Sequence, residues 1–127
     1  MNLNENQLTT LVIDKCFEIH RELGPGLFES VYEKILAFEL KREGLIVQEQ
    51  LGLPVEWKEE RIDLGFRIDL KVENKLIIEL KSIETILPVH KKQLLTYIRL
   101  SKIKLGLLVN FNENLLKDGL HRVVNNL

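Results

Sequence analysis

The sequence of 127 residues lacks any apolar run long enough to cross a membrane, and it holds a single cysteine, Cys16. A bilayer-spanning helix needs about 20 consecutive apolar residues, and the polar start MNLNENQLTT does not resemble a signal peptide. One cysteine cannot form an internal disulfide, which excludes a disulfide-stapled scaffold. We therefore expect a cytoplasmic protein with no membrane partner, in which Cys16 is a small buried hydrophobe.

Several common catalytic motifs are also missing. No Cys/His cluster has zinc-ligand spacing, no glycine-rich phosphate loop precedes a helix, and no serine lies in a Gly-x-Ser-x-Gly elbow. The net charge is only −1, whereas a basic net charge is typical of a nucleic-acid-binding protein. Residues 88–112 nevertheless hold five lysines and arginines and no acid. This segment would steer an anionic substrate toward an acidic metal site, although a solvated helix face explains it equally well.

What is present is the composition of one compact domain. Hydrophobic residues make up 45% of the chain and charged residues 29%, values that are normal for globular proteins and that argue against disorder or a fibrous class. A chain of this length can bury a core without disulfides or a structural metal. We predict a single domain over residues 1–127.

Hydrophobic periodicity predicts the order of the elements. Helices are expected over about 6–23, 27–43 and 88–100, the first two separated by the break LGPG. A period of two predicts an extended segment over 46–58, a hairpin over 61–72 and 76–82, and a buried strand over 104–111. A short amphipathic helix over about 115–124 would close the chain. The predicted fold class is α+β (α/β), a mixed sheet flanked by helices in the order ααβββαβ(α), with the last strand parallel to an earlier one.

The hairpin carries an unusual arrangement of charge. If its apolar residues all bury on one face, Val72 pairs with Leu76, Leu70 with Ile78 and Ile68 with Leu80, and 73–75 form the turn. The same register sets Asp69 opposite Glu79 and Arg67 opposite Lys81. Directly opposed like charges are destabilising, so a divalent cation between the two carboxylates is one explanation. A pair of unfavourably placed surface residues is the other.

These residues suit phosphodiester hydrolysis. That reaction requires Mg²⁺ or Mn²⁺ held by oxygen ligands, an activated water and a cation that supports the charge on phosphorus. Asp69, Glu79 and the backbone carbonyl of Leu80 could hold the metal. Lys81, two residues beyond Glu79, could orient or deprotonate the water or stabilise the transition state.

An Asp followed ten residues later by Glu-x-Lys resembles the core motif of the PD-(D/E)XK nuclease superfamily. The segments GPGLFESVYE, FRIDLKVENKLIIELKS, HKKQLLTYIRLS and GLLVNFN, in this order, further resemble the small bacterial GxxExxR family of that superfamily, over about residues 8–124. Two positions depart from the pattern: Ile68 replaces the nominal proline, and Tyr32 stands where the family label has Arg. The resemblance implies a restriction-endonuclease-like fold and a metal-dependent nuclease.

The resemblance also points to residues outside the hairpin. Glu29 corresponds to an acid that related nucleases use as a further metal ligand or support, although the helix dipole alone favours an acid there. Glu33, one turn on, is expected to face solvent. Gln93 and Tyr97 share a helix face and match a Gln-x-x-x-Tyr of RecB-like members, with His90 on the same face. Gln93 could bind Lys81, a metal-bound water or a phosphate, or could be an ordinary polar residue of the helix, and Tyr97 and His90 are possible contacts to the substrate or to the site residues.

Two functions fit the sequence. The first is a Mg²⁺- or Mn²⁺-dependent nuclease acting on DNA or RNA, for which a homodimer or a partner protein that delivers substrate would supply additional binding surface. The second is a nucleic-acid-binding or protein-binding module that keeps the fold without turnover. The intact set of Asp69, Glu79 and Lys81 favours the nuclease.

Overall fold

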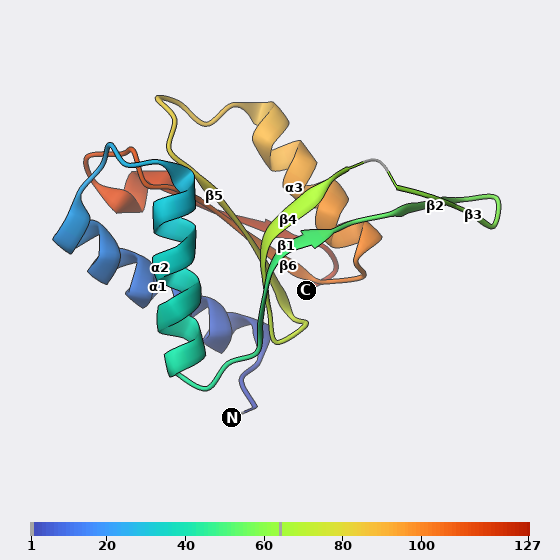
Figure 1. Ribbon diagram of the computed structural model, residues 1–127, viewed down its shortest axis with the longest axis horizontal. Helices are drawn as coiled ribbons and strands as arrows, with labels where there is room; N and C mark the ends of the chain where they lie inside the picture. The colour runs from blue at the N-terminus through green and yellow to red at the C-terminus, as the bar shows by residue number, and fades with distance from the viewer. Residues whose placement is uncertain (1, 64) are drawn as a thin grey trace.

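The computed structural model describes residues 2–63 and 65–127. Its centre is a five-stranded mixed sheet in the order β1-β4-β5-β6-β7, and a separate two-stranded ribbon, β2 with β3, extends away from it (Figure 1). The helices are α1 (Glu5–Leu23), α2 (Glu29–Arg42) and α3 (Pro88–Leu100), with a short 3₁₀ helix, η1 (Leu116–Gly119). The strands are β1 (Val47–Gly52), β2 (Val55–Trp57), β3 (Glu60–Ile62), β4 (Arg67–Val72), β5 (Leu76–Lys81), β6 (Leu105–Asn110) and β7 (Leu120–Val124). This is the restriction-endonuclease-like mixed architecture that the sequence predicts.

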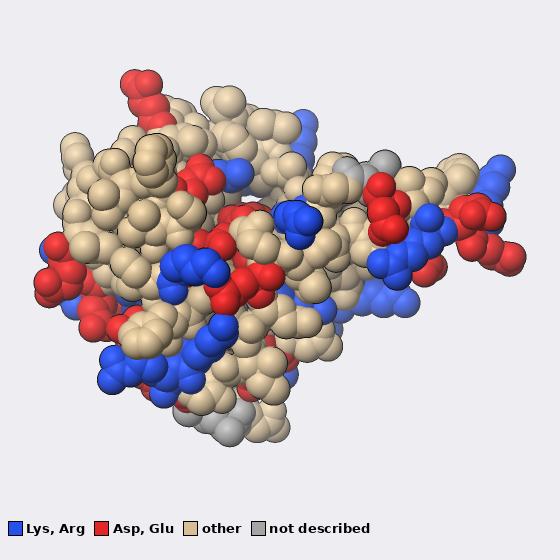
Figure 2. All heavy atoms as spheres, viewed as in Figure 1, with Lys and Arg blue, Asp and Glu red and all other residues tan. Residues whose placement is uncertain are grey.

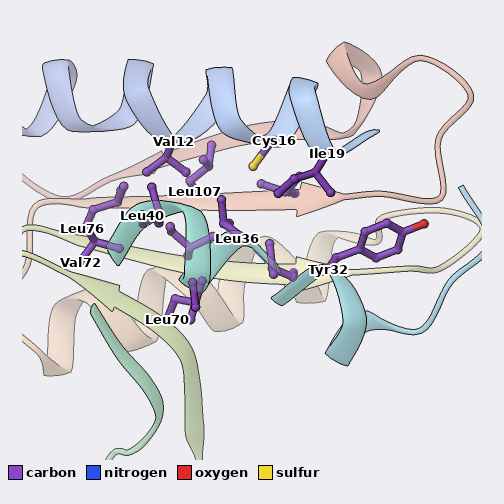
Figure 3. Packing of buried hydrophobic residues seen from close by; sticks show 14 of the residues in the cluster. Val12, Cys16, Ile19, Tyr32, Leu36, Leu40, Leu70, Val72, Leu76 and Leu107 are labelled. Atoms are coloured by element: carbon purple, nitrogen blue, oxygen red, sulfur yellow. The ribbon is translucent and has the colours of Figure 1, made fainter. Parts of the chain in front are cut away.

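Both faces of the sheet are covered. Helices α1 and α2 pack on one face, where Val12, Cys16 and Leu36 meet residues of β4 to β6 (Figure 3). Helix α3 covers the other face and packs against Ile77 and neighbouring residues. All residues of β6 are buried, as are all residues of β5 except Lys81. Cys16 is fully buried, as predicted, and burial raises the pKa of its thiol far above the ordinary value.

The predicted hairpin register is confirmed near its turn and wrong beyond it. Val72 pairs with Leu76 and Leu70 with Ile78, and the turn at Glu73 and Asn74 has positive φ at both residues. Among the described residues, β4 and β5 pair no further than Leu70 and Ile78. The expected pairs Asp69–Glu79, Ile68–Leu80 and Arg67–Lys81 do not form. The Asp69 carboxylate instead accepts a hydrogen bond from the Leu80 amide. The two strands therefore separate where the site residues lie.

Crossover helix α3 leads to β6, which pairs parallel with β5 as predicted. The helix predicted over 115–124 is wrong: η1 ends at Gly119, and β7 then pairs antiparallel with β6. The amide and carbonyl groups on the outer side of β6 need partners, and a buried strand edge left unpaired is costly. The hydrogen bonds that β7 supplies to β6 therefore outweigh the local helical spacing of the apolar residues.

Each of the two longer predicted strands is interrupted in the structure. The segment 46–58 becomes β1 and β2, which are separated by Leu53 and Pro54, and 61–72 becomes the end of β3 and then β4. Strands β2 and β3 pair only with each other among the described residues. No helix in the described chain is long and apolar enough to cross a membrane.

Candidate active site

Asp69 lies on β4 at the point where β4 and β5 separate. One carboxylate oxygen, Oδ2, accepts a hydrogen bond from the Leu80 amide at 2.9 Å, and Oδ1 accepts a long one from Gln50 Nε2 at 3.4 Å. Gln50 is held in β1 with a φ of 49°, a conformation that is uncommon for a residue other than glycine. These two donors fix the orientation of the Asp69 carboxylate from both neighbouring strands.

Glu79 lies on β5 and is only 7% exposed. It is two residues from Ile77, which packs with α3, so both side chains are on the face of the sheet that α3 covers. Its Oε1 atom is buried and has no hydrogen-bond partner among the described residues. Burial, and next the negative charge of Asp69, raise the pKa of Glu79 to about 10, whereas the Lys81 charge acts in the opposite direction. An unpaired buried carboxylate is costly, so this group needs a proton or a cation.

A cavity of about 660 Å³ opens beside Asp69. Glu29 and Glu33 of α2 also line it. Figure 2 shows acidic side chains gathered in a hollow near the middle of the view. Glu29, at the first turn of α2, accepts a hydrogen bond from the Ser82 amide at 3.2 Å. The structure thus brings the predicted Glu29 and Asp69 to one cavity. Glu79 is buried and does not line this cavity, but it lies close enough to Asp69 for the Asp69 charge to raise its pKa.

A family model for the PD-(D/E)XK nuclease superfamily matches residues 6–123. The chain belongs to the PD-(D/E)XK nuclease superfamily. Searches of curated proteins and of solved structures found no significant match. The five-stranded mixed sheet with helices on both faces agrees with the fold of this superfamily, whose nucleases generally use divalent metal ions.

The residues at the separating strands fit a divalent cation. Asp69 and Glu79 supply carboxylate oxygens, the ligands that Mg²⁺ and Mn²⁺ prefer, and the unpartnered Oε1 of Glu79 is a free acceptor. Within the described residues, no group of three His, Cys, Asp or Glu side chains is arranged to hold a metal. A complete shell would therefore need backbone or water oxygens. Leu80, whose carbonyl the sequence suggests as a ligand, lies on β5 beside Val109.

Lys81 ends β5 and is half-buried, and its backbone carbonyl accepts a hydrogen bond from the Phe111 amide. This bond and the parallel pairing with Asn110 fix the backbone from which the Lys81 side chain extends. The Lys81 ammonium lies close enough to Glu79 for its charge to favour the ionised carboxylate. The chain thus has a lysine ammonium close to its buried Glu79 carboxylate.

Glu33 corrects a prediction. It was expected to face solvent, yet it is 6% exposed and accepts a hydrogen bond from Gln50 Nε2 at 2.7 Å. Burial raises its pKa, with a further contribution from Asp69. Glu29 and Glu33 are four residues apart and therefore share a helix face. Because Glu29 was predicted at the site, the same spacing could have predicted that Glu33 also faces it. No comparable signal marked Gln50, whose position depends on its unusual backbone conformation.

The predicted residues of α3 are divided between core and surface. Tyr97 is buried and packs against Phe66 with a centroid distance of 6.1 Å, and burial together with the charges of Glu79 and Asp69 raises its pKa. His90 accepts a hydrogen bond from the Leu87 amide through Nδ1 at the start of the helix. Gln93 is exposed. None of the three lines the described cavity, and their predicted roles remain predictions.

Proposed function

We propose that this chain is a nuclease that hydrolyses phosphodiester bonds of DNA or RNA with the help of Mg²⁺ or Mn²⁺. The observation that best supports this function is the buried, unpartnered Oε1 of Glu79, which lies close enough to the oriented carboxylate of Asp69 for the two charges to interact. Stability alone disfavours this pair, because two nearby carboxylates repel each other and burial penalises their charge. Membership in the PD-(D/E)XK superfamily supplies the matching chemistry.

In this proposal Asp69 and Glu79 hold the metal, with Glu29 and the Leu80 carbonyl as further oxygen ligands. A divalent ion held there would supply Lewis acidity. The hydrogen bonds from Leu80 and Gln50 keep Asp69 in one orientation, so little reorganisation is needed on binding. Because the cavity is lined by acids, a phosphate would be repelled unless positive charge were present.

Lys81 is a positive charge that the chain provides close to Glu79. We infer that its ammonium orients the attacking water or stabilises charge on the phosphoryl oxygens. Gln93 and Tyr97, with His90, would support the substrate or the site from α3. The motif segments further suggest the GxxExxR family within the superfamily, and a homodimer or a partner protein would extend the surface that grips the nucleic acid.

Cleavage assays with Mn²⁺ test the function directly. The substrates are single-stranded, duplex and branched DNA and RNA, and the proteins are wild type, Lys81→Ala and Lys71→Ala. Lys71 is a matched control because it lies on β4 of the same hairpin and pairs with Ile77. We expect Lys81→Ala to lose about 100-fold or more of the cleavage rate, which is typical of a lost catalytic group, and Lys71→Ala to retain it. Cleavage that is equal in all three proteins, or absent from wild type, would contradict the proposal.

A further inference from the structure

Phe28 is 83% exposed, more than any other large hydrophobic side chain in the described residues. It precedes α2 as the N-cap residue, and its side chain makes no capping hydrogen bond. Ser, Thr, Asp or Asn at that position would satisfy a free amide of the first turn. A phenylalanine therefore leaves the helix uncapped and also exposes a large apolar ring. Neither feature helps the protein to fold.

The ring is exposed, but the backbone around it is held on both sides. The Tyr32 hydroxyl donates to the Gly24 carbonyl at 2.5 Å and accepts from the Leu27 amide at 3.2 Å. Ser82, directly after Lys81, donates its hydroxyl to the Leu27 carbonyl at 2.6 Å and its amide to Glu29. Tyr32 is itself stacked on Phe111 with a centroid distance of 4.3 Å. Phe28 is thus an exposed ring on a fixed support that is joined to the end of β5.

The position of Phe28 indicates what it would contact. It lines the same cavity as Glu29, Glu33 and Asp69, so its ring borders the proposed reaction site. The acids repel phosphate groups, whereas a nucleobase is neutral and has a flat face that stacks on an aromatic ring. Within an intact duplex each base face is already covered by its neighbours. A base is free to meet Phe28 only where the strand is unpaired.

We propose that Phe28 is a stacking platform for an unpaired base next to the cleaved bond, which makes single-stranded nucleic acid the preferred substrate class. This inference rests on the proposed nuclease function for its link to cleavage. The stacking itself is a property of binding and can be measured without turnover.

Binding is measured by fluorescence anisotropy in Mg²⁺, with all variants placed on the Lys81→Ala background. The probes are a labelled oligothymidylate, a strand of the same length made of abasic sites, and a blunt duplex. Phe28→Ala should weaken oligothymidylate binding by about 5- to 150-fold, the range that base stacking on an aromatic ring is worth, and Phe28→Trp should retain it. Binding of the abasic strand, which keeps its phosphates, should not change.

Phe38→Ala is the matched control. Phe38 is also on α2 and 58% exposed, but it lies near Arg42 rather than at the cavity. Phe28→Ser adds a second test, because serine can cap α2: it should raise the melting temperature and still lose oligothymidylate affinity. A lower melting temperature would show that Phe28 serves the fold and would overturn the inference.

Unchanged oligothymidylate binding in Phe28→Ala, or an equal loss for the abasic strand, would also overturn it and would leave Phe28 as a contact for a protein partner. Failure of the nuclease proposal is visible separately. In that case wild type would cleave no substrate with Mn²⁺, while the selective loss of oligothymidylate binding in Phe28→Ala would persist.

Discussion

Replacing Glu79 with Gln should change how the stability of the protein depends on pH. The pKa of Glu79 is raised from 4.5 to about 10 in the folded protein, first by burial and then by Asp69. Between these values the folded state keeps the proton and the unfolded state releases it. The unfolded state then binds fewer protons, so stability falls as pH rises, by about 1.4 kcal/mol per pH unit for one group.

Over the range from pH 5 to pH 8, wild type should therefore lose about 4 kcal/mol relative to Glu79→Gln, which carries no titrating group at this position. The variant keeps the size and polarity of the side chain, and the other acids are common to both proteins. The assay is urea unfolding of both proteins at several pH values in EDTA. The difference between their free energies of unfolding should change steadily with pH.

Metal provides an internal check on this prediction. A cation that binds the ionised carboxylate competes with the proton, so saturating Mn²⁺ should flatten the slope for wild type and leave that of Glu79→Gln almost unchanged. Parallel stability curves for the two proteins in EDTA would refute the reasoning, because they would mean that Glu79 titrates alike in the folded and unfolded states.

Three further predictions concern the metal, the fold and the support of Phe28. Mn²⁺ should raise the melting temperature of wild type, and Asp69→Ala should abolish the shift; an equal shift in the variant would contradict the metal site. Gly106→Ala should cost about 1–3 kcal/mol in urea unfolding, because an added Cβ would lie 2.8 Å from Leu94 Cγ; an unchanged midpoint would show that Leu94 yields freely. Tyr32→Phe should cost about 1–3 kcal/mol, since it removes the hydroxyl that holds Gly24 and Leu27, and a stability equal to wild type would mean that water replaces it.

The β4–β5 hairpin and the parallel β5–β6 pair could be predicted from sequence because strict alternation and a fully apolar strand leave few other arrangements. The separation of the strands at Asp69 could not be predicted, because it depends on the Asp69 side chain, which accepts the hydrogen bond of the Leu80 amide. The placement of Asp69 and Glu29 at one site followed from the family motif. The burial of Glu79 depends on α3, which covers that face of the sheet.

The wrong prediction of a helix at the C-terminal end has a recognisable signal in hindsight. Leu116 and Leu120 have helical spacing, but Gly119 lies between them, and glycine is unfavourable inside a helix. In the structure, a side chain at Gly119 would collide with the Asn110 carbonyl oxygen. The glycine is there because two backbones approach closely, which a one-dimensional pattern does not reveal.

The connection of β5 to its two neighbours has a consequence for the order of folding. Strands β4 and β5 are joined by a short turn, whereas β5 meets β6 only after the chain has passed through α3. Closing the longer loop costs more chain entropy and slows contact formation. We expect the hairpin that carries Asp69 and Glu79 to form early, while both carboxylates are still hydrated and repel each other weakly. The electrostatic conflict would then arise late, when α3 docks and excludes water, so substitutions at Glu79 should alter the unfolding rate far more than the folding rate.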